Sequence, residues 1–452
     1  MIFARQALLA DGWAENVRVT IANMRIAGIT AGAKAEPDDQ RVDTLLPALS
    51  NLHSHSFQRA MAGMTEHRAR GRESFWTWRE TMYKFLAHLT PKHVEAIAAL
   101  VFMEMQEAGY AAVGEFHYVH HRAGGGHYDD MAELSARIFS AAAQTGIGLT
   151  HLPVLYSYGG AGKQPLAGGQ LRFGNDVDDF ESLLTAARRA AAALPDDTAV
   201  GIAPHSLRAT SPEDLRRTIP LADGRPIHIH VAEQPKEVAD VSAWLGARPV
   251  EWLVANMPVD RAWCAIHATH MTPEETASLA RSGAVAGLCP ITEANLGDGP
   301  FNGPAWIANH GGFGIGSDSN VRISLTEELR TLEYSQRLRD LSRNVWVRDG
   351  GSVGESIYTH AARGGAQALG RAAGEIAIGK YADLLAIDSN HPALCVLPRD
   401  QVLDGLCFAA PDQVVTDLWS AGRHRVRGGL HLSREGIVKK YRAAVIDLKA
   451  RL

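Results

Sequence analysis

The sequence predicts an α/β protein with a (β/α)8 TIM-type barrel and a small β-sandwich domain to which both termini contribute. Eight short apolar segments between residues 47 and 375 alternate with longer amphipathic stretches, the pattern expected of repeated βα units. Strand-like segments occupy residues 1–46 and recur within 376–452. The 452 residues, of which 46% are hydrophobic, suffice for one large domain and one small domain.

The expected elements follow in chain order. Residues 17–21 alternate apolar and polar side chains, and residues 24–30 continue as a second strand after a turn. Eight barrel strands are expected at residues 45–51, 110–118, 146–156, 199–206, 225–233, 262–269, 283–290 and 312–319. Helical patterns stand between them, most clearly at residues 91–109 and 176–195. Further strands are expected in 376–388 and 417–431, and a terminal helix over 434–451.

Composition narrows the possible partners. The net charge is −5 and no block of Lys and Arg occurs, so nucleic acid is not an expected partner. No apolar run approaches the ~18 residues of a membrane span, and the N-terminus has no signal-peptide pattern. The four cysteines lie far apart and form no CxxC pair, which is typical of free thiols in a reducing compartment. We therefore expect a cytoplasmic protein with a small-molecule ligand.

Polar residues gather where the predicted barrel strands end, which is where barrels of this type carry their chemistry. His53 and His55 stand two residues apart at the end of strand one, so both point to one face. His230, His267 and Asp318 end strands five, six and eight. Imidazoles with a carboxylate are typical ligands of zinc or iron.

Each of these residues also has a plainer interpretation. An isolated His-x-His pair is more often solvated than metal-bound, and a single strand-end histidine is usually packed or solvated. However, four predicted strands end in such residues at the same edge of the barrel, and this coincidence favours a metal site. The histidine-rich segment 117–127 looks like a second metal cluster, but its spacing is more typical of a turn. The glycine-rich segment 157–176 lacks the spacing of a phosphate loop, and we interpret it as a mobile cover.

Several of these segments resemble motifs of the amidohydrolase superfamily. The motifs, in chain order, are LLPALSNLHSH (45–55), HIHVAE (228–233), AIHATH (265–270), GIGSDSN (314–320) and GEIAIGKYADLLAID (374–388). The resemblance implies a divalent metal held by His53, His55, His230 and Asp318, with zinc favoured and iron possible. Two-metal members use a lysine on strand four. This chain has no lysine between Lys163 and Lys236, so one ion per chain is expected.

Residues 53–63 and 75–80 resemble one branch of that superfamily, whose members hydrolyse the amidine of N-formimino-L-glutamate in histidine breakdown. This resemblance implies proton transfer and charge stabilisation by Glu233, His267 and Asp318. It also implies an anionic substrate. Guanidinium groups pair with carboxylates in two-point geometry, so Arg79 and Arg208 are expected to bind the substrate carboxylates. Gln58, Tyr118 and His205 lie at strand ends or in the loop after strand one, and they are expected to donate hydrogen bonds to the substrate or orient it. A homodimer is usual in the family.

Three alternatives stay open at this point. Residues 67–72 or Arg322 could hold the carboxylates in place of Arg79 and Arg208. The enzyme could instead be a guanine-type deaminase or a chlorohydrolase with the same metal site. A non-catalytic barrel that binds metal is the most remote alternative, because Glu233, His267 and Asp318 are all present.

Overall fold

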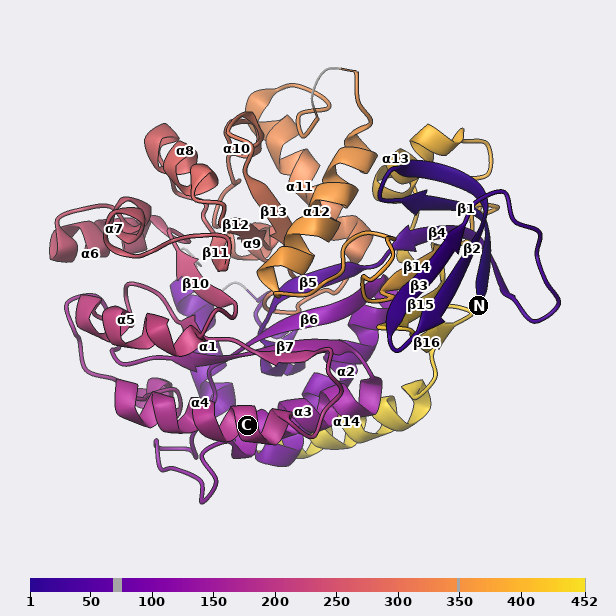
Figure 1. Ribbon diagram of the computed structural model, residues 1–452. Coiled ribbons are helices and arrows are strands. Elements are labelled where there is room, and N and C mark those ends of the chain that lie inside the picture. Colours follow the sequence, from indigo (N-terminus) through magenta and orange to yellow (C-terminus); the bar gives the residue numbers. More distant parts are fainter. Residues whose placement is uncertain (68–74, 348–349, 452) are drawn as a thin grey trace.

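The computed structural model describes residues 1–67, 75–347 and 350–451 (Figure 1). Strands from the two ends of the chain lie together at one side of the molecule, and parallel strands with surrounding helices form the rest. None of the helices within these ranges is long and apolar enough to cross a membrane.

Both termini build one mixed sheet. Its order is β17-β16-β15-β14-β4-β1-β2-β3, in which β4 and β14 join the N-terminal and C-terminal halves by antiparallel pairing. The sequence led us to expect a sandwich, whereas the described strands are hydrogen-bonded into one continuous sheet. The strands are β1 (Ile2–Leu9), β2 (Gly12–Ala22), β3 (Arg25–Thr30), β4 (Gln40–Pro47), β14 (Leu384–Ile387), β15 (Val415–Ser420), β16 (Arg423–Arg427) and β17 (Leu430–His431).

The other strands form two parallel sheets, and every barrel strand expected from the sequence has a counterpart in them. One has the order β5-β6-β7-β8, with β9 also paired to β7, and the other has the order β10-β11-β12-β13. Isolated parallel bridges join Ile202 to Ile227, Ser206 to His230, and Ser54 to Asp318. The bounds are β5 (Leu49–Ser54), β6 (Tyr110–His117), β7 (Gly148–Leu155), β8 (Thr198–Val200), β9 (Ala203–Pro204), β10 (Ile227–Val231), β11 (Trp263–His267), β12 (Val285–Leu288) and β13 (Gly312–Ile315).

Two expected strands are divided: residues 45–51 fall partly in β4 and partly in β5, and strand four is also broken. Residues 199–206 divide into β8 and β9 around Gly201. A Cβ atom at Gly201 would lie only 2.4 Å from the Pro226 carbonyl oxygen, so the backbone of the neighbouring segment comes unusually close there. The break leaves His205 and Arg208 on an irregular segment beyond β9.

Helices follow most of the parallel strands, as the βα alternation predicts. The clearest case is α2, where the Thr90 side chain accepts the His93 N–H at its start and Gly109 ends it in a left-handed conformation. The helices are α1 (Phe75–Leu86), α2 (Pro91–Ala108), α3 (Glu133–Thr145), α4 (Val177–Ala191), α5 (Pro212–Thr218), α6 (Pro235–Leu245), α7 (Pro249–Asn256), α8 (Pro273–Arg281), α9 (Pro290–Leu296), α10 (Gly303–Ala308), α11 (Leu325–Asp340), α12 (Val353–Ala368), α13 (Val402–Phe408) and α14 (Arg434–Lys449).

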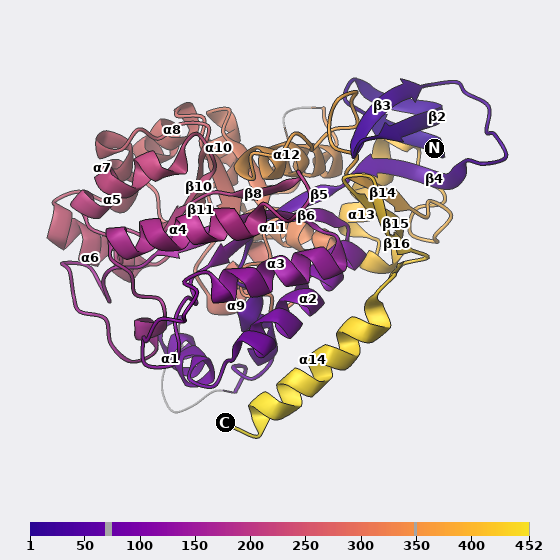
Figure 2. The ribbon, with the colours of Figure 1, turned by 60° about the horizontal axis from the view of Figure 1, so that its bottom comes forward.

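The terminal helix expected over 434–451 is present as α14. It packs along α2, on the outside of the parallel strands (Figure 2). His93 on α2 lies 2.8 Å from Asp447 on α14, measured from Nε2 to Oδ2. The C-terminus is thereby tied to the helix that connects the first two parallel strands.

Candidate active site

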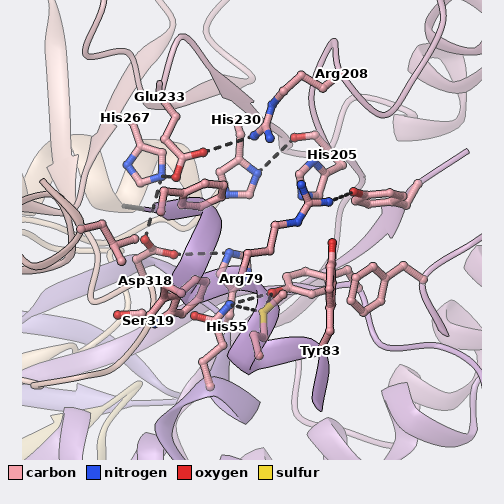
Figure 3. A pocket seen from close by; sticks show the side chains of 18 residues that line it. His55, Arg79, Tyr83, His205, Arg208, His230, Glu233, His267, Asp318 and Ser319 are labelled. Carbon is pink, nitrogen blue, oxygen red and sulfur yellow. Dashed lines mark hydrogen bonds and ion pairs between the residues drawn. The ribbon is translucent and has the colours of Figure 1, made fainter. Parts of the chain in front are cut away.

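The histidines predicted at the strand ends converge at one edge of the parallel strands (Figure 3). His53 Nε2 lies 3.1 Å from His230 Nε2, although the two residues are far apart in sequence. Asp318 Oδ1 lies 3.3 Å from Nε2 of both His53 and His55. The parallel bridge between Ser54 and Asp318 explains this meeting, because it sets strand one beside the segment that follows strand eight.

Backbone carbonyls orient two of these rings. His55 Nδ1 donates to the Phe116 carbonyl at 2.8 Å, and His230 Nδ1 donates to the His205 carbonyl at 3.1 Å. Each ring therefore turns an unprotonated Nε2 toward the site. Burial lowers the pKa of His55 and His230, and it lowers the pKa of His53 to about 3, so all three imidazoles are neutral.

This arrangement has the chemistry of a metal site. Neutral nitrogen lone pairs face one another and a carboxylate, and a cation between them satisfies all these acceptors at once. Ligand atoms of His53, His230, His267 and Asp318 all lie within 4.8 Å of one another. This group includes His267 where the sequence led us to expect His55, whose Nε2 nevertheless adjoins Asp318. The residues present therefore fit one metal ion.

Glu233 and His267 stand beside these residues. His267 Nε2 lies 3.9 Å from Glu233 Oε1 and 3.9 Å from Asp318 Oδ2. Burial alone would lower the pKa of His267, but its hydrogen bond to Glu293 and the charges of Glu233 and Asp318 raise that pKa to about 10. Burial raises the pKa of Glu233. Burial alone would raise the pKa of Asp318, but a hydrogen bond with His53 and the charges of the surrounding histidines lower it.

The backbone is strained where these side chains are placed. Ala232, His267 and Asp318 all have a left-handed conformation, with φ angles of 54°, 68° and 46°. Residues other than glycine rarely adopt such angles, and they gather at functional sites when the surrounding structure holds them there. The strain therefore marks the same strand ends as the polar side chains.

The pocket above this centre contains the expected substrate-binding residues, namely Gln58, Arg79, Tyr118, His205 and Arg208. Arg79 projects from α1 and donates to the Tyr156 hydroxyl at 2.9 Å. Gln58 donates to the Tyr118 hydroxyl at 2.6 Å. Aromatic side chains form much of the remaining wall, which sequence analysis had not assigned: Phe75, Trp78, Tyr83, Tyr156 and Phe173. The aromatic cluster at 75–78 was the available signal.

Arg208 has contacts that the sequence did not predict. Its Nη2 lies 3.3 Å from Glu233 Oε2, and its Nε lies 3.6 Å from Glu237 Oε2. All three side chains are buried. Arg208 is therefore already paired with the carboxylate of Glu233, while Arg79 contacts a neutral phenol.

In the described structure, Arg322 is no alternative to the two pocket arginines, and the second histidine-rich segment forms no metal cluster. Arg322 is exposed, pairs with Glu327 and does not line the pocket. Residues 68–72, the other candidates for carboxylate binding, lie outside the described residues. Within the described part of the chain, His117 and His120 join no group with metal-ligand spacing, and His120 instead contacts the Val154 carbonyl at 3.0 Å.

The segment 157–176 does lie against the pocket. Phe173 forms part of the pocket wall. The buried Arg172 donates to the backbone carbonyls of His121 at 2.8 Å and Leu89 at 3.0 Å. This segment, for which the sequence predicts a mobile cover, is therefore tied at Arg172 to two neighbouring segments.

Comparison with known proteins defines the class. The amidohydrolase family matches residues 44–424, and the chain belongs to that family. Residues 1–43 match the N-terminal domain of formimidoylglutamate deiminase HutF. The chain is 49% identical over 437 residues to the formimidoylglutamate deiminase of Pseudomonas aeruginosa, covering 96% of each protein.

Other similar proteins carry different names. A 5-methylthioadenosine/S-adenosylhomocysteine deaminase of Natronomonas pharaonis is 25% identical, covering 90% of this chain and 85% of that protein. The crystal structure of an amidohydrolase from Brucella melitensis is 46% identical, with a TM-score of 0.95 over 99% of both chains. An adenosine deaminase from Xanthomonas campestris with bound zinc is 22% identical, with a TM-score of 0.83 over 99% of this chain and 98% of that chain.

Proposed function

We propose that this chain hydrolyses N-formimino-L-glutamate to N-formyl-L-glutamate and ammonia in histidine degradation. It is a hydrolase that acts on a non-peptide C–N bond, as its formimidoylglutamate deiminase relative is. The observation that carries the assignment is a single pocket containing Arg79, Arg208 and Glu233 above the His/Asp centre. The guanidinium groups suit the two substrate carboxylates, while the centre suits hydrolysis of the amidine.

The metal would be held by His53, His55, His230 and Asp318, with His267 beside it. One divalent ion per chain is expected, and zinc suits three nitrogens and one oxygen, with iron as the alternative. Zinc is also the ion bound in the adenosine deaminase from Xanthomonas campestris. A divalent ion there would supply a Lewis acid that lowers the pKa of a water molecule toward neutrality.

Proton transfer is assigned to the carboxylates. Asp318 accepts a proton from the attacking water, whose oxygen then bonds to the amidine carbon. Glu233, whose pKa burial raises, delivers a proton to the terminal nitrogen, which leaves a tetrahedral carbon bearing OH and NH2. The proton held by Asp318 then passes to the same nitrogen while the hydroxyl proton returns to Glu233, so that the C–N bond breaks, the C=O bond forms and ammonia leaves. His267 lies 3.9 Å from both carboxylates, where its Nε2 can orient the water and stabilise charge at the reacting carbon.

Substrate orientation is assigned to the pocket wall. Arg79 would bind one carboxylate, because its guanidinium faces the pocket and lies there among neutral groups, the Tyr156 hydroxyl and the rings of Trp76 and Tyr83. Arg208 would bind the other while keeping its contact with Glu237. Gln58, Tyr118 and His205 line the same space and offer donors that fix the formimino end.

We also propose a domain organisation and a cellular setting for this enzyme. We assign the eight parallel strands to one (β/α)8 barrel over residues 47–375, supported by the bridges that link the two sheets on both sides. Residues 1–46 and 376–452 would form the second domain. We propose a cytoplasmic homodimer that acts on a small carboxylate-bearing molecule, with neither nucleic acid nor membrane as a partner. Four free cysteines suit a reducing compartment.

The decisive experiment is a substrate comparison. Ammonia release should be measured with N-formimino-L-glutamate, guanine, cytosine and a neutral formamidine, using the metal-loaded protein. Formiminoglutamate should be preferred by at least about tenfold in kcat/KM, the effect of losing one charge-assisted contact. Preference for guanine or another neutral heterocycle would contradict the assignment and favour a guanine-type deaminase.

A further inference from the structure

The segment after strand seven contributes a buried carboxylate to the back of the site. Glu293 lies in the first turn of α9, and only 6% of its surface is exposed. Its Oε1 accepts the Cys289 backbone N–H at 2.9 Å and lies 3.2 Å from His267 Nδ1. The carboxylate is thus fixed by the start of the helix and directed at one nitrogen of the imidazole.

This contact determines which nitrogen of His267 faces the reaction. A carboxylate accepts hydrogen bonds, so His267 Nδ1 carries a hydrogen and donates it to Glu293. Nε2 is then turned toward Glu233 and Asp318, 3.9 Å from each. His267 has a left-handed backbone conformation, with φ of 68°. Residues other than glycine keep such a conformation only where surrounding contacts hold it, and the hydrogen bond to Glu293 is one such contact.

We propose that Glu293 is a positioning residue for His267. Its hydrogen bond with Nδ1–H holds the imidazole so that Nε2 is directed at the reacting centre. This inference rests on the proposed function for its kinetic consequences. The contact itself is independent of the substrate.

Neighbouring residues of the same segment support this role. Thr292 Oγ1 lies 2.9 Å from Ser319 Oγ, next to Asp318. Asp298 accepts a hydrogen bond from Gln234, next to Glu233. One short segment therefore contacts His267 and the immediate neighbours of both proposed proton-transfer carboxylates.

Glu293 could instead serve only to start the helix, and a matched residue separates the two roles. Glu328 Oε2 accepts the Ile291 backbone N–H of the same helix at 2.9 Å, and its side chain is fully buried. It hydrogen-bonds to α9 without being paired with His267. Glu328→Gln is accordingly the control for loss of a buried carboxylate at this helix.

The kinetic test compares Glu293→Gln, Glu293→Ala and Glu328→Gln in the metal-loaded enzyme with N-formimino-L-glutamate. Glu293→Gln keeps an acceptor for Nδ1 but loses the charge, and kcat should fall by about tenfold. Glu293→Ala loses the acceptor as well, and kcat should fall by about a hundredfold. KM, metal content and the thermal midpoint of Glu293→Gln should stay near those of the parent, and Glu328→Gln should keep kcat within about twofold. An equal loss of kcat in Glu328→Gln would overturn the proposal.

A second variant tests whether Glu293 acts through the imidazole. In a His267→Asn background, Glu293→Gln should cause no further loss of kcat, because residues that act as one unit are not additive. An undiminished loss in that background would show that Glu293 acts elsewhere.

Nitrogen-15 NMR of the histidine rings detects the hydrogen bond between His267 Nδ1 and Glu293 without any substrate. His267 Nδ1 should carry a hydrogen in the parent and in Glu328→Gln, and this signal should change in Glu293→Ala. An unchanged Nδ1 signal in Glu293→Ala would refute the positioning role. The parent could release no ammonia from formiminoglutamate while the Nδ1 signal still changed in Glu293→Ala. That result would refute the proposed function and support the contact between Glu293 and His267.

Discussion

Arg79→Met is the sharpest test of how the pocket recognises an anion. Arg79 donates to the Tyr156 hydroxyl at 2.9 Å, a contact with a neutral group, whereas Arg208 is paired with Glu233 and Glu237. Among the described residues, removing the Arg79 cation therefore leaves no carboxylate without a partner. The variant should keep its fold and its metal, and the substrate carboxylate should be the charged group that loses a partner.

The expected loss follows from one charge-assisted hydrogen-bonded pair. Such a pair contributes about 1.5–3 kcal/mol, which corresponds to roughly a tenfold to hundredfold decrease in kcat/KM for N-formimino-L-glutamate. The assay is steady-state ammonia release, with metal analysis and urea unfolding of each protein. Tyr156→Phe is the matched control, because it removes the hydroxyl partner of Arg79 and keeps the cation.

A neutral formamidine provides the second control. It has no carboxylate, so it should be a poor substrate of the parent and respond little to Arg79→Met. A normal kcat/KM for formiminoglutamate in Arg79→Met would refute carboxylate binding by this arginine. An equal proportional loss with both substrates would place its effect on the reacting centre rather than on recognition.

The remaining predictions concern metal, proton transfer, charge burial and pH. Elemental analysis of fully active protein should give one divalent ion per chain, and two ions would contradict the single-site assignment. Glu233→Gln should retain metal and fold while ammonia release falls by ~10²-fold or more, and near-normal turnover would remove Glu233 from proton transfer. Arg208→Met should lower kcat/KM by at least about tenfold and also destabilise the fold by about 3–5 kcal/mol in urea unfolding, because it leaves buried carboxylates unpaired; unchanged stability would contradict this pairing. Burial lowers the pKa of His151 to about 3 from 6.5, so between these values the unfolded chain binds a proton that the folded chain does not. Its contribution should reduce stability by about 1.4 kcal/mol per unit as pH falls through that interval, and His151→Gln should flatten this dependence in unfolding experiments.

Much of the fold was predictable because the parallel strands are buried along their length and appear as short, mostly apolar segments between longer amphipathic ones. The break in strand four was not, since it depends on how closely Pro226 approaches Gly201 in space. The joining of both termini into one sheet also depends on a pairing between β4 and β14 that no local pattern reveals.

The candidate site also has residues that the sequence predicted and residues that it did not. His53 and His55 were predictable because a period of two places both on one face of a strand, and His230 and His267 because strand ends of a barrel share one edge. Glu293 had no comparable signal. Its place beside His267 depends on how α9 begins, and an acidic residue in a first helical turn is common for capping alone.

Specificity is harder to predict than the metal centre because it depends on what each arginine contacts. The adenosine deaminase from Xanthomonas campestris shares this fold at a TM-score of 0.83 with only 22% identity, so fold similarity does not determine the substrate. The sequence suggested Arg79 and Arg208 as equivalent partners for two carboxylates. In the structure Arg208 also pairs at 3.3 Å with Glu233, the group proposed to protonate the departing nitrogen. A substrate carboxylate that binds Arg208 must therefore share or displace this contact, which joins recognition to proton transfer. Within the described part of the chain Arg79 contacts no carboxylate, so the two arginines should differ in how their loss divides between KM and kcat.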